Sequence, residues 1–137
     1  MALVKALSLA LFGSTLANLL MLILFGPMVI DQSNPLHALT VAPIAIFTVI
    51  GVLGAVIVYA AMRVFLRNPN RSFLIVAGIV LVLSFIPDLL IVGQTSGPFG
   101  GGNIGSAALL MTMHVATGAI VTWALIRLWG PRPQSMS

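Results

Sequence analysis

The fold is decided around residues 63–71, which read RVFLRNPNR. This segment holds three of the six Lys and Arg residues of the chain, and it separates two long apolar runs. Asn-Pro is a turn signal, and each neighbouring run reaches the ~20 residues that a transmembrane helix needs. The segment therefore predicts a tight turn between two antiparallel membrane spans.

The other basic residues, Lys5, Arg127 and Arg132, lie near the two ends of the chain. Between the charges we expect four spans, at about residues 6–25, 39–65, 72–92 and 104–129. If each span crosses a bilayer, all six basic residues fall on one side, and the two connections on the other side carry none. Cytoplasmic segments of membrane proteins are enriched in Lys and Arg. We therefore expect both termini in the cytoplasm.

The spans are expected to be helices, because their apolar runs are continuous and do not alternate as the strands of a membrane barrel do. Short connections make sequential spans antiparallel neighbours. The expected fold is an all-α, up-down four-helix transmembrane bundle that forms a single domain over residues 1–137. Composition agrees, since 60% of the residues are hydrophobic and 6% are charged, against roughly 25% charged in soluble domains.

Composition and motifs exclude several classes of function. The net charge of +4 comes from basic residues scattered over three short segments, so we expect no nucleic-acid partner. The chain has no cysteine, which removes disulfides and thiolate chemistry. It carries no phosphate-binding loop, no nucleophile elbow and no zinc-protease motif. We assign no catalytic residue, no metal and no cofactor. Whether the protein is an enzyme stays open, and these observations favour a non-enzymatic role.

Polar residues inside the spans form the candidate binding site, which consists of Asn18, Ser84, Asp88 and His114. Asp88 is the only acid and His114 the only histidine within a span, and helix lengths place all four residues in adjacent layers of one membrane half. Pro87 beside Asp88 frees a backbone carbonyl. Two interpretations stay open: interhelical contacts that hold the bundle together, or a site for a proton, an ion or a small ligand. A haem ligated by His114 is a weaker possibility.

Residues at helical spacing also predict which face of each span points into the bundle. Small and polar side chains recur every three or four residues, which lets lipid-embedded helices approach one another. The expected inward residues are Ala10, Ser14 and Asn18; Thr48, Gly51 and Ala55; Ala77, Ser84 and Asp88; and His114, Thr117, Gly118 and Val121.

Two segments of the second half carry a family resemblance. They are VLSFIPD at residues 82–88 and ALLMTMH at residues 108–114, the latter followed by an apolar helix that ends at Arg127. Together they resemble a bacterial family of four-span membrane proteins, domain of unknown function 6069. The matching positions are Ser84, Pro87 and His114. The resemblance implies a four-span topology and a bacterial source, and it brings no activity.

From these features we expect a multi-pass protein of the bacterial plasma membrane that faces the lipid bilayer. Its small size favours a non-enzymatic accessory or scaffolding subunit of a membrane complex, with another membrane protein or further copies of itself as partner. The alternative is a carrier or binder of a small ligand, ion or proton at the polar cluster. A lipid-modifying enzyme that uses Asp88 and His114 as acid and base is the third possibility.

Overall fold

The structure, a computed structural model, describes residues 1–30, 35–94, 96 and 100–130. Within these residues the chain forms helices and no strand. The four long helices are α1 (Ala2–Val29), α2 (Val41–Phe65), α3 (Pro69–Leu90) and α4 (Ile104–Ala124). A short 3-10 turn, η1 (His37–Leu39), precedes α2, and a π-helical turn, η2 (Leu125–Trp129), continues α4. The predicted all-α, four-helix fold is confirmed.

All four long helices have the length and composition to cross a membrane. Most of their large apolar side chains are exposed, such as Phe12, Phe47 and Ile79. A soluble protein would bury these groups, whereas a bilayer is itself an apolar solvent for them. The chain is therefore a multi-pass membrane protein whose outer surface contacts lipid.

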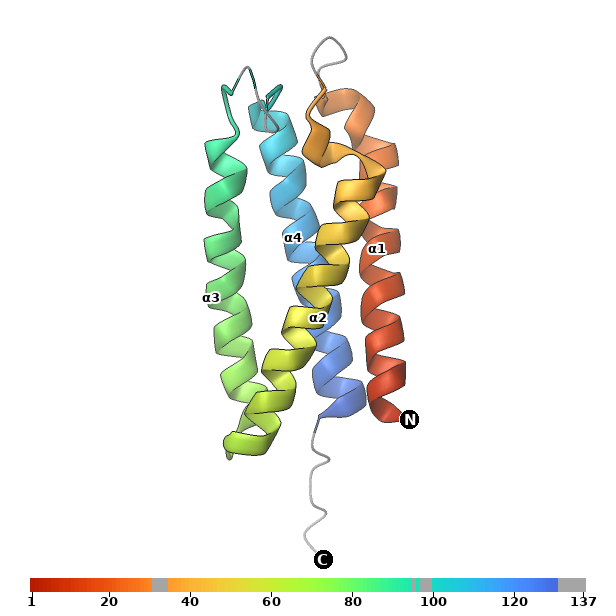
Figure 1. Ribbon diagram of the computed structural model, residues 1–137, viewed down its shortest axis with the longest axis vertical. Helices are drawn as coiled ribbons and strands as arrows, with labels where there is room; N and C mark the ends of the chain where they lie inside the picture. The colour runs from red at the N-terminus through yellow and green to blue at the C-terminus, as the bar shows by residue number, and fades with distance from the viewer. Residues whose placement is uncertain (31–34, 95, 97–99, 131–137) are drawn as a thin grey trace, which may run out of the picture.

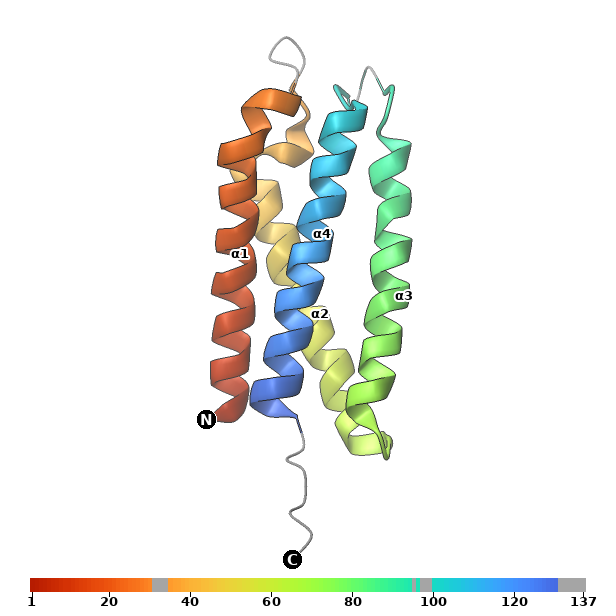
Figure 2. The ribbon, with the colours of Figure 1, turned by 180° about the vertical axis from the view of Figure 1, so that it is seen from behind.

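The helices are arranged as a row of three with the fourth laid across it. α1, α4 and α3 stand side by side, and α2 crosses one face of the row from α1 at one end to α3 at the other (Figures 1 and 2). The start of α1 and the end of η2 lie at the same end of the bundle, which we call the terminal end. The end of α1, the start of α2, the end of α3 and the start of α4 lie at the opposite end, which we call the loop end.

Local sequence explains where the helices begin. Pro69 occupies the first turn of α3 directly after Asn68, a position where its missing N–H costs nothing. Asn103 and Ser106 form a reciprocal capping box at the start of α4. The end of α1 differs from the expected residue 25, and Pro27 lies inside the helix. The helix runs on to Val29, and the Ile30 N–H still bonds to the Gly26 carbonyl at 2.9 Å.

The α3–α4 connection is folded back on itself at the loop end. Gly93 N–H donates to the Gly102 carbonyl at 3.0 Å, and Gly101 N–H donates to the Gln94 carbonyl at 2.9 Å. Glycine is required here for two reasons. Gly93 and Gly101 have positive φ angles of 82° and 84°, and a Cβ on Gly102 would collide with the carbonyl oxygen of Ile91.

The core consists of two apolar clusters, one at each end of the bundle. The cluster at the terminal end is centred on Tyr59, which is fully buried. Its ring packs against Phe73 at 4.8 Å and Trp129 at 5.6 Å between centroids, and its hydroxyl donates to Asn70 Oδ1. Arg63 stacks over the Trp129 ring at 4.6 Å. Tyr59 thereby joins α2, α3 and η2. The second cluster, at the loop end, contains Leu36, Leu39, Ile44, Ile91, Leu109 and Met113.

We predict that Tyr59→Ala destabilises the bundle by about 3 kcal/mol or more, because it leaves a cavity where three elements meet. Tyr59→Phe keeps the ring and loses only the hydrogen bond to Asn70, which should cost about 1 kcal/mol. The measurement is denaturant-induced unfolding in detergent micelles. Ile57→Ala is the control, since Ile57 is 69% exposed on the same helix. Equal losses for Tyr59→Ala and Ile57→Ala would contradict the central role of Tyr59.

Candidate functional site

A layer of polar side chains separates the two apolar clusters. α1 contributes Asn18, α2 contributes Thr48, α3 contributes Asp88, and α4 contributes His114 and Thr117. Polar groups that lie within hydrocarbon need partners inside the protein, and most of these side chains contact one another. The layer contains two separate sets of contacts, an Asp88–His114 pair and an Asn18-centred group.

Asp88 and His114 form a direct contact between α3 and α4. The distance between Asp88 Oδ2 and His114 Nδ1 is 3.0 Å, and the carbonyl oxygen of Leu110 lies 2.9 Å from the same ring nitrogen. A carbonyl oxygen can only accept, so Nδ1 carries a hydrogen. One N–H cannot align with both acceptors, and Asp88 Oδ2 has no directed hydrogen bond to any described residue. Its contact with the ring is therefore chiefly electrostatic.

The two members of the pair differ in exposure. The Asp88 side chain is 7% exposed, whereas the His114 side chain is 41% exposed. A buried carboxylate is costly in hydrocarbon unless a cationic or hydrogen-bonding group faces it. The imidazole provides that group on one side, and its exposed edge faces out of the bundle. The pair thus connects a buried acid with the protein surface.

The position of the pair follows from where the two helices end. At ~1.5 Å per residue, His114 lies about 15 Å along α4 from Ile104. Asp88 lies in the last turn of α3, which ends at Leu90. Because Asp88 contacts His114, the end of α3 lies closer to the middle of the bundle than the start of α4 does, as Figure 1 shows.

Asn18 forms the other part of the layer and joins three helices. Its Nδ2 donates to Thr48 Oγ1 at 3.0 Å and to Thr117 Oγ1 at 2.9 Å. Asn18 Oδ1 and the fully buried Ser14 Oγ, one turn away on α1, have no hydrogen-bond partner among the described residues. Rotating the amide by 180° would exchange its two polar atoms and still leave one unpaired. Buried polar atoms of this kind are commonly satisfied by ordered water.

The four residues proposed from the sequence are thus distributed over three environments. Asp88 and His114 contact each other, while Asn18 pairs with Thr48 and Thr117. Ser84 is half-buried, and its hydroxyl donates to the Leu81 carbonyl of its own helix at 2.7 Å. Sequence reasoning placed Thr48 and Thr117 on inward faces and did not include them in the site. Their helical spacing from the other inward residues was the signal that pointed to them.

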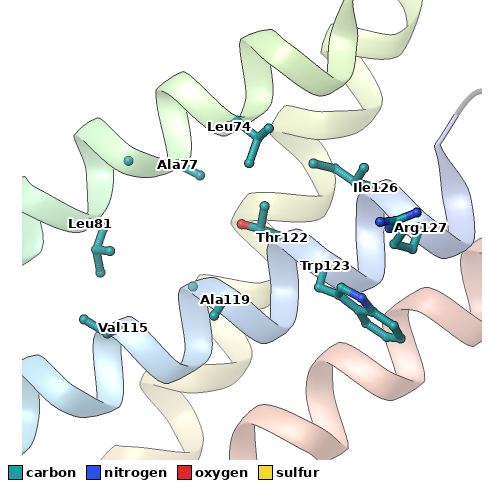
Figure 3. A pocket seen from close by; sticks show the side chains of 11 residues that line it. Leu74, Ala77, Leu81, Val115, Ala119, Thr122, Trp123, Ile126 and Arg127 are labelled. Atoms are coloured by element: carbon teal, nitrogen blue, oxygen red, sulfur yellow. The ribbon is translucent and has the colours of Figure 1, made fainter.

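The geometry narrows what the pair could bind. No group of three or more His, Cys, Asp or Glu that could hold a metal occurs in the part of the chain described. Two open grooves lie along α4 toward the terminal end, one against α3 (Figure 3) and one against α1, and none of the four proposed residues lines either. With 3.0 Å between nitrogen and oxygen, the pair has room between its atoms for a proton and for nothing larger.

Comparison with known proteins gives a family and no activity. A model of the DUF6069 family, described as a family of unknown function, matches residues 1–129. No curated protein and no solved structure matches the chain. The match covers both segments that carried the resemblance, as well as α1 and α2. The chain belongs to the DUF6069 family of unknown function.

Proposed function

We propose that this small membrane protein binds a proton inside the bilayer, at the Asp88–His114 pair. The observation that carries the proposal is the 3.0 Å contact between a buried carboxylate and a half-exposed imidazole. As an ion pair the two groups together hold one titratable proton and carry no net charge. Loss of that proton would leave a net negative charge in hydrocarbon, and gain of a second would leave a net positive charge.

The asymmetry of the pair supports exchange of the proton with the surroundings. Nδ1 faces Asp88 and Leu110, and no hydrogen bond joins Nε2 to a described residue. The exposed edge of the ring takes up or releases the proton, and the charge of Asp88 Oδ2, 3.0 Å from Nδ1, stabilises the protonated ring. The buried acid thus favours proton binding without being exposed itself. A purely structural contact would not need an exposed imidazole edge.

This proposal predicts that the protonation of His114 depends on Asp88. In ¹⁵N-histidine-labelled protein in lipid bilayers, the His114 signals should respond to pH between about 4 and 9, a range that brackets ordinary histidine titration. Asp88→Asn should move the His114 transition by about one pH unit or more, because the neighbouring carboxylate is gone. The His37 signals, from η1, should be the same in the Asp88→Asn variant as in the unmodified protein and provide the internal control. A His114 signal that is invariant over this range would mean that the pair is a static structural contact.

An accessory or scaffolding role is the second candidate, and a different observation favours it. α2 covers only one face of the α1–α4–α3 row, and the opposite face is left open (Figure 2). In the middle of that face, Ala119 and the 54% exposed Trp123 separate the two grooves. A helix of another membrane protein could pack there, since small residues allow close approach of backbones.

The accessory role predicts a larger assembly in the native membrane. Native mass spectrometry after mild detergent extraction should then give a mass above that of the 14.4 kDa chain, with a heteromeric composition. Ala119→Leu should reduce the amount of this assembly, because it fills the seam between the grooves. Gly54→Leu on α2, where an added Cβ meets nothing within 4 Å, is the matched control. A bare monomer for the unmodified protein would count against this role.

We propose further that the terminal end faces the cytoplasm of a bacterium and that the protein resides in the plasma membrane. The distribution of charge supports this orientation. Every basic residue of the described chain belongs to the terminal end: Lys5, Arg63, Arg67, Arg71 and Arg127. A one-sided excess of Lys and Arg is the main determinant of orientation in bacterial membrane proteins.

The orientation predicts a simple labelling pattern, because the chain has no cysteine of its own. A membrane-impermeant maleimide added to intact cells should label Ser96→Cys at the loop end. It should label Ala2→Cys at the terminal end only after the membrane is permeabilised. Both positions are exposed, so a difference in reaction reports the side of the membrane. The reverse pattern would place the terminal end outside.

A further inference from the structure

A groove lies between α3 and α4 and is open to the outside of the bundle. It has a volume of about 460 Å³, within the ~300–1,000 Å³ of small-molecule sites. Both of its walls carry small residues, Ala77 and Gly78 on α3 and Gly118 and Ala119 on α4. Such residues normally bring two helices into close contact. Here a Cβ on Gly78 would meet nothing within 4 Å, and one on Gly118 would lie 3.9 Å from Leu81 Cδ1.

The groove is nearly all apolar and runs along the membrane normal. Its long side chains are Leu74, Leu81, Val115 and Ile126 (Figure 3). From Val115 to Arg127 it extends about 18 Å along α4 at ~1.5 Å per residue, slightly more than half of the ~30 Å hydrocarbon thickness. An apolar space open to the bilayer is filled by hydrocarbon, because a void would forfeit its dispersion contacts. The dimensions match the depth of one leaflet.

The two ends of the groove differ in charge. Arg127 lines the groove at the terminal end, and Trp123 lies one turn before it on α4 (Figure 3). No hydrogen bond, ion pair or ring contact joins Arg127 to another described residue. The only acid in the described helices, Asp88, lies toward the loop end. This end of the groove therefore carries a positive charge that no acid in the described helices neutralises. It lies at the depth where tryptophan side chains and lipid headgroups meet.

We propose that this groove binds one acyl chain of an anionic phospholipid from the terminal-side leaflet, with the lipid phosphate on Arg127. The chain fills the space that the glycines leave open, and the guanidinium pairs with phosphate oxygens in bidentate geometry. Arg127 belongs to the π-helical turn Leu125–Trp129 that continues α4. The site lies apart from the Asp88–His114 pair and does not depend on its role.

Tryptophan quenching tests the proposal in the full-length protein. The chain has two tryptophans, and Trp129→Phe leaves Trp123, which lines the groove, as the only reporter. The protein is reconstituted in phosphatidylcholine vesicles that contain a small fraction of brominated phosphatidylglycerol or, in parallel, of brominated phosphatidylcholine. We expect the anionic lipid to quench Trp123 with about fivefold higher apparent affinity, as one favourable basic contact implies. Arg127→Gln should abolish this preference, so that the two lipids quench Trp123 equally.

Filling the groove gives the second arm of the experiment. Gly118→Leu should reduce quenching by both lipids, whereas Gly51→Leu on α2, where an added Cβ meets nothing within 4 Å, should not. Gly78→Leu, on the opposite wall, replaces Gly118→Leu if that variant loses its helical circular dichroism. Equal quenching by the two lipids in the Trp129→Phe protein, with Arg127 and Gly118 in place, would overturn the proposed contact between the lipid headgroup and Arg127. Quenching by neither lipid, together with a dimeric mass, would show that a second copy of the chain covers the groove.

Discussion

The bilayer leaves a polar group in a span only one way to be satisfied, which is a partner inside the protein. The rest of the structure depends on how this chain meets that constraint. Asn18 holds Thr48 and Thr117, and Asp88 faces His114, so every helix is tied into one layer. Apolar contacts cannot do this alone, because the same side chains are equally well solvated by lipid. The polar layer therefore sets the register of the helices, and the two apolar clusters pack on either side of it.

α3 shows most clearly how polar contacts between spans hold a helix in place. It is the least buried of the four spans and packs on α4 and on one end of α2. Its two polar attachments lie at opposite ends, Asp88 on His114 and Asn70 accepting from Tyr59. Between them the glycine-lined groove separates the middle of α3 from α4. Polar contacts near both ends of α3 explain how so exposed a helix keeps its place.

The sequence predicted the helices and their antiparallel order, because apolar runs and charged turns are local signals. It also predicted that Asp88 and His114 lie in adjacent layers of one membrane half, since the ~1.5 Å rise per residue converts residue number into height. It could not predict the diagonal path of α2, which depends on how side chains of different helices interlock. That path explains an error in the inward face of α2. The buried stripe of α2 follows Ile44, Thr48 and Val52, so Gly51, expected inside, faces outward.

The charge of each polar residue and of its partner explains why the two parts of the candidate site, the Asn18-centred group and the Asp88–His114 pair, differ in what they can do. A buried asparagine with two threonine partners is neutral in every state, so it can stabilise the bundle without responding to its surroundings. The acid and the histidine differ, because each charge is tolerable only while the other compensates it. Removing Asp88 or His114 leaves a charge or an unpaired polar group in hydrocarbon. Moving a proton between the two residues leaves the pair neutral. The proposed proton binding is thus confined to the α3–α4 contact, at the least buried of the four helices.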